Sequence, residues 1–77
     1  MVGMELLEHW WNGAAGRSRE DVIVRAAADG VHEVELRVGG RSIKREYRTR
    51  DEAMTISGGL RAVGVWLELS SVCAVAS

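Results

Sequence analysis

The chain has 77 residues, of which 47% are hydrophobic and 27% charged, and its 10 basic and 11 acidic side chains leave a net charge of -1. A chain of this length forms one domain with a small core, because it buries only about 60% of the surface that its unfolded form exposes. The near-neutral charge excludes a strong long-range attraction to phosphate, so nucleic-acid binding would need a local concentration of basic residues.

The sequence offers no covalent, metal or membrane anchor. Its single cysteine, Cys73, cannot form an internal disulfide and cannot build a zinc site alone, so we expect no metal and no cofactor. The first residues, MVGMELLEH, are acidic where a signal peptide is basic, and no apolar run approaches the ~20 residues that span a bilayer. We therefore expect one cytoplasmic domain over residues 1–77 without membrane contact, and leave open whether the tail after about residue 71 is ordered.

The first predicted element is a short helix in the segment GMELLEHWWNG. Met4, Leu7 and Trp11 share one stripe at helical spacing, and Asn12 and Gly13 are typical of a helix end. Adjacent residues on a helix point about 100° apart, so Trp10 and Trp11 cannot both face one core. We expect Trp11 in the core and Trp10 exposed.

Three strands follow, in EDVIVRA, HEVELRV and RSIKREYRT. A two-residue turn at Gly39 and Gly40 predicts the pairs Val38 with Arg41, Leu36 with Ile43, Glu35 with Lys44, and His32 with Tyr47. For the first hairpin we prefer a three-residue loop at Asp29, Gly30 and Val31, which predicts Val24 opposite Leu36 and Ala26 opposite Val34. The alternative two-residue loop would place Val24 opposite Glu35. Our preferred loop puts the apolar residues of all three strands on one face.

A second helix should begin at Thr49, because Thr49 and Glu52 form a capping box. Its predicted core stripe is Ala53, Ile56, Leu60 and Val63, with Gly64 as the C-cap. Residues 65–71 alternate as a fourth strand, with Trp66 expected in the core. The prediction is thus a two-layer α+β domain of order α-β-β-β-α-β: a short N-terminal helix, a three-stranded antiparallel meander, one helix and a fourth strand. So thin a core favours a homodimer, through a sheet edge or the tryptophans.

Five of the chain's ten basic residues lie within residues 41–50. They form either the solvated outer side of a strand or a binding ridge, in which arginine forks would meet carboxylate or phosphate groups. Tryptophan and arginine are also enriched at interface hot spots. The predicted partner-binding residues are Trp10, Arg37, Arg41, Lys44, Arg45, Arg48 and Arg50.

The predicted order over residues 4 to about 63 resembles that of the double-stranded RNA-binding domain. In that family lysines at the start of the second helix hold phosphates, whereas Arg50, Asp51 and Glu52 stand here. Acidic residues at a helix N-terminus neutralise an anion site, so we reject this family. His9 and His32 have no second ligand at metal spacing, and no serine lies in a nucleophile motif. We expect a protein that is not an enzyme.

Three functions remain open. The leading hypothesis is a non-catalytic protein-interaction module that binds and inhibits a larger protein or nucleoprotein complex, as small bacterial or phage-encoded inhibitors such as anti-CRISPR proteins do. The first alternative is nucleic-acid binding by the basic strand of residues 41–50, and the second is a structural homodimerisation domain. Steep salt dependence would distinguish nucleic-acid binding from protein docking.

Overall fold

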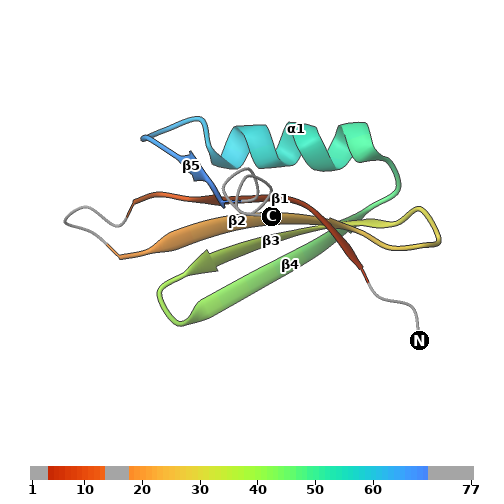
Figure 1. Cartoon of the computed structure of the whole chain (residues 1–77), viewed down its shortest axis with the longest axis horizontal. Coiled ribbons are helices and arrows are strands. Elements are labelled where there is room, and N and C mark those ends of the chain that lie inside the picture. The colour runs from red at the N-terminus through yellow and green to blue at the C-terminus, as the bar shows by residue number, and fades with distance from the viewer. Residues whose placement is uncertain (1–3, 14–17, 70–77) are drawn as a thin grey trace.

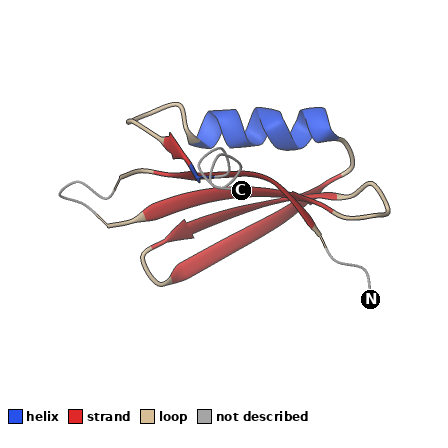
Figure 2. Cartoon of the chain, viewed as in Figure 1, coloured by secondary structure: helices blue, strands red, loops and turns tan. Residues whose placement is uncertain are grey.

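A computed structural model describes residues 4–13 and 18–69, which form one antiparallel sheet with a helix on one of its faces (Figure 1). The elements in chain order are β1 Glu5–Trp11, β2 Glu20–Ala26, β3 His32–Val38, β4 Arg41–Tyr47, α1 Arg50–Leu60 and β5 Leu67–Glu68. The strands lie in the order β4-β3-β2-β1-β5. Figure 2 shows α1 lying above the sheet as a second layer. No helix in the described part of the chain is long and apolar enough to cross a membrane.

The predicted N-terminal helix is wrong, because residues 5–11 form strand β1 and the order is β-β-β-β-α-β. The coarser class, an α+β domain with a helix on a sheet, agrees with the structure. The misleading signal has a physical cause, since a bulge between Leu6 and Glu8 interrupts the pairing of β1 with β2. The extra residue, Leu7, packs against the core, so the apolar residues of β1 lose the strict alternation that marks a strand.

The β3–β4 hairpin follows the prediction. Val38 pairs with Arg41, Leu36 with Ile43, Glu35 with Lys44, and His32 with Tyr47. Gly39 has a φ of +59° at the first position of the two-residue turn. Glycine adopts this conformation without steric cost.

The predicted register of the β2–β3 hairpin is wrong by two residues. Val24 lies opposite Val34, not Leu36, and Ala26 lies opposite His32, not Val34. The turn lies one residue earlier than expected, at residues 28–30, because Ala27 N–H donates to the Val31 carbonyl oxygen at 2.8 Å. A shift of two residues leaves every side chain on its face, so the predicted apolar face is still formed.

The core lies between α1 and the middle of the sheet, and consists of Val22, Val24, Val34 and Ala53. On the helix, Ala53 and Ser57 are the buried residues. The other three members of the predicted stripe are not in the core, since Ile56 is 39%, Leu60 38% and Val63 82% exposed. Small side chains let the helix approach the sheet closely, and the larger apolar residues consequently lie on its flank.

The helix begins as predicted and ends early. Thr49 is the N-cap, and its hydroxyl accepts a hydrogen bond from the Glu52 backbone N–H at 3.2 Å. The helix ends at Leu60 with Arg61 as the C-cap, so the assignment of Gly64 as the cap is wrong.

The predicted fourth strand of residues 65–71 is shorter in the structure. Within residues 65–69, the part of this segment that the structure describes, Leu67 and Glu68 form β5, which pairs with the end of β1. The Trp66 indole packs against the core as expected, and its N–H donates to the Val63 carbonyl oxygen at 2.9 Å. Cys73 and the tail whose order we left open lie outside the described residues.

Candidate functional site

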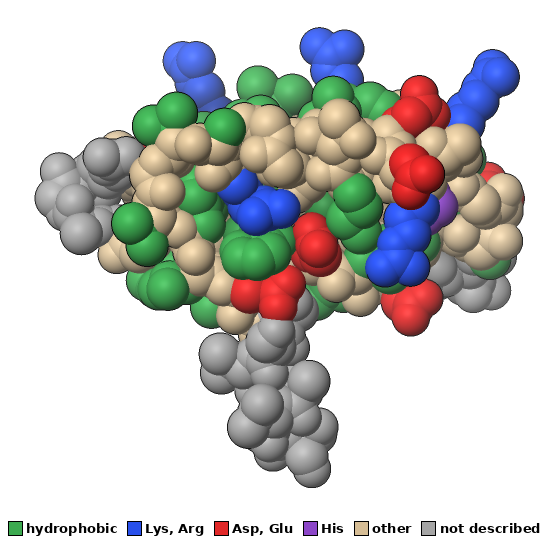
Figure 3. Space-filling model, turned by 90° about the horizontal axis from the view of Figure 1, so that it is seen from above, with side chains coloured by type: hydrophobic (Ala, Val, Ile, Leu, Met, Phe, Trp, Pro, Cys, Tyr) green, Lys and Arg blue, Asp and Glu red, His purple; other side chains and the backbone are tan. Residues whose placement is uncertain are grey.

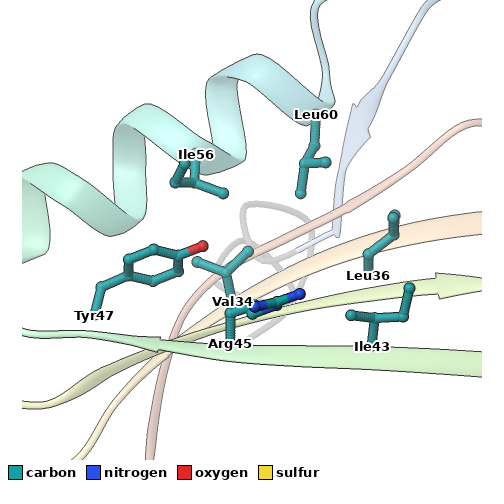
Figure 4. Close-up of a pocket in the computed structure, with 7 residues that line it drawn as sticks. All are labelled: Val34, Leu36, Ile43, Arg45, Tyr47, Ile56 and Leu60. Carbon is teal, nitrogen blue, oxygen red and sulfur yellow. The ribbon is translucent and has the colours of Figure 1, made fainter.

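An apolar groove runs between α1 and β4 on the helix side of the sheet (Figure 4). Its volume is about 190 Å³, and its lining residues are Val34, Leu36, Ile43, Arg45, Tyr47, Ile56 and Leu60. In Figure 4 Ile56 and Leu60 descend from α1 toward the side chains of β3 and β4. The groove is therefore bounded by helix on one side and sheet on the other.

The groove exists because α1 does not cover β4 fully. Ala53 and Ser57 hold the helix over the centre of the sheet, while Ile43 of β4 is left 56% exposed. Ile56 and Leu60, exposed on the flank, face the same space. Figure 3, the view from the helix side, shows hydrophobic side chains at the surface among acidic and basic ones. Contiguous apolar surface of this kind is typical of binding sites.

Arg45 is the charged residue of the groove. It is exposed and lies between Tyr47 and Ile43 along β4 (Figure 4). It makes no ion pair with any residue that the structure describes. A second hollow of about 320 Å³ adjoins the groove and is lined by Tyr47, Asp51, Glu52, Thr55 and Ile56. The surface thus has a free cation within the groove and carboxylates at one end.

The seven predicted partner-binding residues do not form one ridge. Arg41 and Arg45 pair with apolar-face residues of β3, whereas Lys44 lies opposite Glu35 on the other face. Arg48 follows β4 and Arg50 begins α1, both exposed. The structure therefore distributes these basic residues over two faces and a helix end.

Arg37, one of the predicted partner-binding residues, has its charge neutralised by an ion pair with Glu35. Its Nε donates to Glu35 Oε2 at 2.8 Å. Glu35, only 2% exposed, also accepts hydrogen bonds from Arg25 Nη1 at 2.8 Å and from the Ser42 hydroxyl. Burial by itself raises the pKa of Glu35, but the hydrogen bonds from Arg37, Ser42 and Arg25 outweigh it and lower the pKa to about 2.

A second charged cluster lies around Asp21. Like Glu35, Asp21 is on the face of the sheet that α1 does not cover, which we call the uncovered face. His9 Nε2 lies 2.7 Å from Asp21 Oδ2, and Arg19 Nε donates to Asp21 Oδ1 at 2.9 Å. Burial by itself raises the pKa of Asp21. The hydrogen bonds from Arg19 and His9 outweigh burial, so the pKa of Asp21 lies below its ordinary value. These contacts hold Asp21 as a carboxylate and occupy its oxygens, so the cluster has a structural role.

Sequence reasoning missed both buried carboxylates. The pairing of Glu35 with Lys44 across the strands is as predicted, yet the side-chain bonds of Glu35 go to Arg25, Arg37 and Ser42. The alternation of Glu33, Glu35 and Arg37 indicated only a polar face. Burial on that face comes from neighbouring long side chains, which a strand pattern does not report.

The two adjacent tryptophans exchange their expected positions. On a strand, successive side chains point to opposite faces, so Trp10 packs against the core and Trp11 lies on the uncovered face. The Arg61 guanidinium lies 4.0 Å from the centre of the Trp10 ring, and that of Arg19 lies 4.6 Å from the Trp11 ring. Trp10 is half-buried, so the expectation that it is the exposed anchor is wrong.

Within residues 4–13 and 18–69, no three His, Cys, Asp or Glu side chains are grouped so that they could hold a metal ion. Comparisons with protein-family models, with curated proteins and with solved structures found no match for this chain. The geometry of the groove is therefore the basis for a proposed function.

Proposed function

We propose that this protein is a non-catalytic interaction module that binds a larger protein or nucleoprotein complex and inhibits it by occupying its surface. The observation that supports this proposal is the exposed apolar groove between α1 and β4. Ile43, Ile56 and Leu60 present apolar surface to solvent there, in a domain whose core is small. Burial of such surface against a partner is the main favourable term in protein association.

The groove favours a partner of defined chemistry. A volume of about 190 Å³ accommodates one large apolar side chain, not an extended ligand. Arg45 lies beside that space without an ion-pair partner among the described residues. We infer a protein surface that inserts a leucine- or phenylalanine-sized anchor and places a carboxylate next to it.

Nucleic-acid binding is less well supported by the same geometry. The basic residues lie on both faces of the sheet, Arg37 is neutralised by Glu35, and Asp51 and Glu52 occupy the first turn of the helix. Binding to a phosphate backbone needs basic side chains aligned along one surface of the protein.

The test is capture from host lysate with and without nuclease, followed by titration of the identified partner in purified form. Leu60→Lys places a charge in the groove, and Ala62→Lys adds the same charge at an exposed position outside the groove lining. Burial of a leucine-sized side chain is worth about 1.5–3 kcal/mol. Leu60→Lys should therefore weaken binding roughly ten- to a hundredfold, while Ala62→Lys binds as the parent does.

Two results would contradict the proposal. One is a purified protein partner that binds the parent and Leu60→Lys equally, because the groove would then not be the contact. The other is recovery of nuclease-sensitive material alone, with an affinity that falls by about one power of salt concentration per phosphate contacted.

A further inference from the structure

The outer edge of β4 is the largest unpaired backbone edge in the described part of the sheet. β4 is the terminal strand and has seven residues, whereas β5 at the opposite edge has two. The two-residue turn makes Val38 and Arg41 a hydrogen-bonded pair, and such pairs alternate along an antiparallel ladder. The backbone N–H and C=O groups of Ser42, Lys44 and Glu46 therefore point away from β3.

We propose that a second copy of this chain pairs antiparallel with β4, edge to edge, about a two-fold axis at Arg45. In this register Lys44 lies opposite the partner's Glu46, and Ile43 lies opposite the partner's Tyr47. The outward-pointing backbone groups of Lys44 and Glu46 then meet those of their counterparts. The product is one continuous ten-stranded sheet with both helices on the same face. This inference goes beyond the proposed function and does not depend on it.

The charges of β4 select this register. Residues opposite each other in an antiparallel pair of strands lie on the same face of the sheet. The two-fold axis must therefore pass through a residue and not between two residues. A shift of the axis to Lys44 would place that residue opposite the partner's Lys44, and a shift to Glu46 would oppose two carboxylates. With the axis at Arg45, two Lys–Glu pairs and two Ile–Tyr pairs form by symmetry. Oppositely charged and aromatic–aliphatic pairs stabilise a ladder, and like charges opposite each other destabilise it.

The axis carries one unfavourable pair, Arg45 opposite the partner's Arg45. Both side chains are long and exposed, and each lies diagonal to the partner's Tyr47, whose ring face attracts a guanidinium. The pairing also covers Ile43, the most exposed apolar residue of β4. The pairing reaches the groove only through its β4 residues, because Ile56 and Leu60 lie on α1 and not on the strand edge.

The register can be tested by charge exchange between two variants. Lys44→Glu places two pairs of carboxylates opposite each other in the homodimer, and Glu46→Lys places two pairs of ammonium groups there. Each variant alone should dimerise roughly tenfold or more weakly than the parent. An equimolar mixture should form a heterodimer, because both of its cross-strand pairs then have opposite charges. Sedimentation velocity over a concentration series, with native mass spectrometry of the mixture, measures this.

Glu46→Lys also keeps the test independent of folding. Glu46 lies opposite Glu33 within the chain, so the new base relieves a like-charge contact and the monomer should fold at least as well. Lys44→Pro supplies a backbone test, because it removes an N–H that points away from β3. We expect a monomer whose circular dichroism spectrum matches that of the parent.

The proposal would be overturned by a parent chain that stays monomeric up to its solubility limit, by a dimer that neither charge reversal weakens, or by a mixture that forms no heterodimer. If Lys44→Glu mixed with the parent dimerises best, the axis lies at Lys44 and the proposed register is wrong. Leu60→Lys should dimerise like the parent while losing the partner, so failure of the dimer and failure of the groove can be told apart.

Discussion

Glu35 is a carboxylate buried on the uncovered face of the sheet, and we predict that it dominates the acid sensitivity of the fold. Hydrogen bonds from Arg37, Ser42 and Arg25 outweigh the burial that opposes its charge and lower its pKa from 4.5 to about 2. Between these two values the unfolded chain binds a proton that the folded chain does not bind. Stability is therefore fully present above about pH 5 and falls as the pH falls toward 2.

The magnitude follows from the difference between the two pKa values. One pH unit corresponds to 1.36 kcal/mol, so a fall from 4.5 to about 2 stabilises the folded state by about 3 kcal/mol at neutral pH. Small domains have a total stability of about 5–15 kcal/mol, so this single group carries a large share. Glu35→Gln removes the charge and replaces one of the two acceptor oxygens with an N–H donor, which weakens the contacts with Arg25 and Arg37 and costs a similar amount at pH 7.

Urea unfolding followed by tryptophan fluorescence, at fixed protein concentration and at several pH values from 7 to 2, measures both effects. The parent should lose about 3 kcal/mol more than Glu35→Gln over this range, so that the two stabilities converge near pH 2. Glu5→Gln is the matched control, because Glu5 is an exposed carboxylate at the start of β1. Stability curves of the parent and of Glu35→Gln that stay parallel would refute the assigned role of Glu35.

Four further substitutions test the packing and capping of α1. Gly58→Ala and Gly59→Ala should each stabilise the protein by about 1 kcal/mol, since an added methyl group meets no atom within 4 Å at either position. A lower thermal unfolding temperature for either variant would contradict the open space at that position. Thr49→Ala removes the N-cap and should cost about 1 kcal/mol in urea unfolding. Arg61→Ala should cost about 0.5–1 kcal/mol and shift the fluorescence of Trp10, whose ring the guanidinium covers; an unchanged emission spectrum would contradict that contact.

The parts of the fold that the sequence predicts are those fixed by local rules. The two glycines at 39 and 40 define the turn, and the turn fixes every pair of the β3–β4 hairpin. Thr49 and Glu52 define the start of α1 for a similar reason. β1 was not predictable in this way, because its bulge at Leu7 gives apolar spacings that a short helix would also give.

The candidate site was only partly predictable because it depends on how α1 turns over the sheet. Sequence periodicity could not distinguish the stripe with Ile56 and Leu60 from the one with Ala53 and Ser57, since both have helical spacing. Close packing favours the smaller residues at the contact, which leaves the larger ones to line the groove. Arg45 was predicted from sequence as a partner-binding residue, and strand alternation places it on the face of β4 that lines the groove.

The charges along β4 affect how its exposed edge can pair with other chains. An unpaired strand is a template for indiscriminate pairing, and proteins commonly protect such edges with lysine and other charges. On β4 the charges alternate in sign at Lys44 and Glu46. A uniform row of lysines would repel every copy, whereas this pattern repels copies in the neighbouring registers and admits the one centred on Arg45. The same residues can therefore oppose open-ended association and favour a closed dimer, because the two-fold axis pairs the β4 edge of each copy with that of the other.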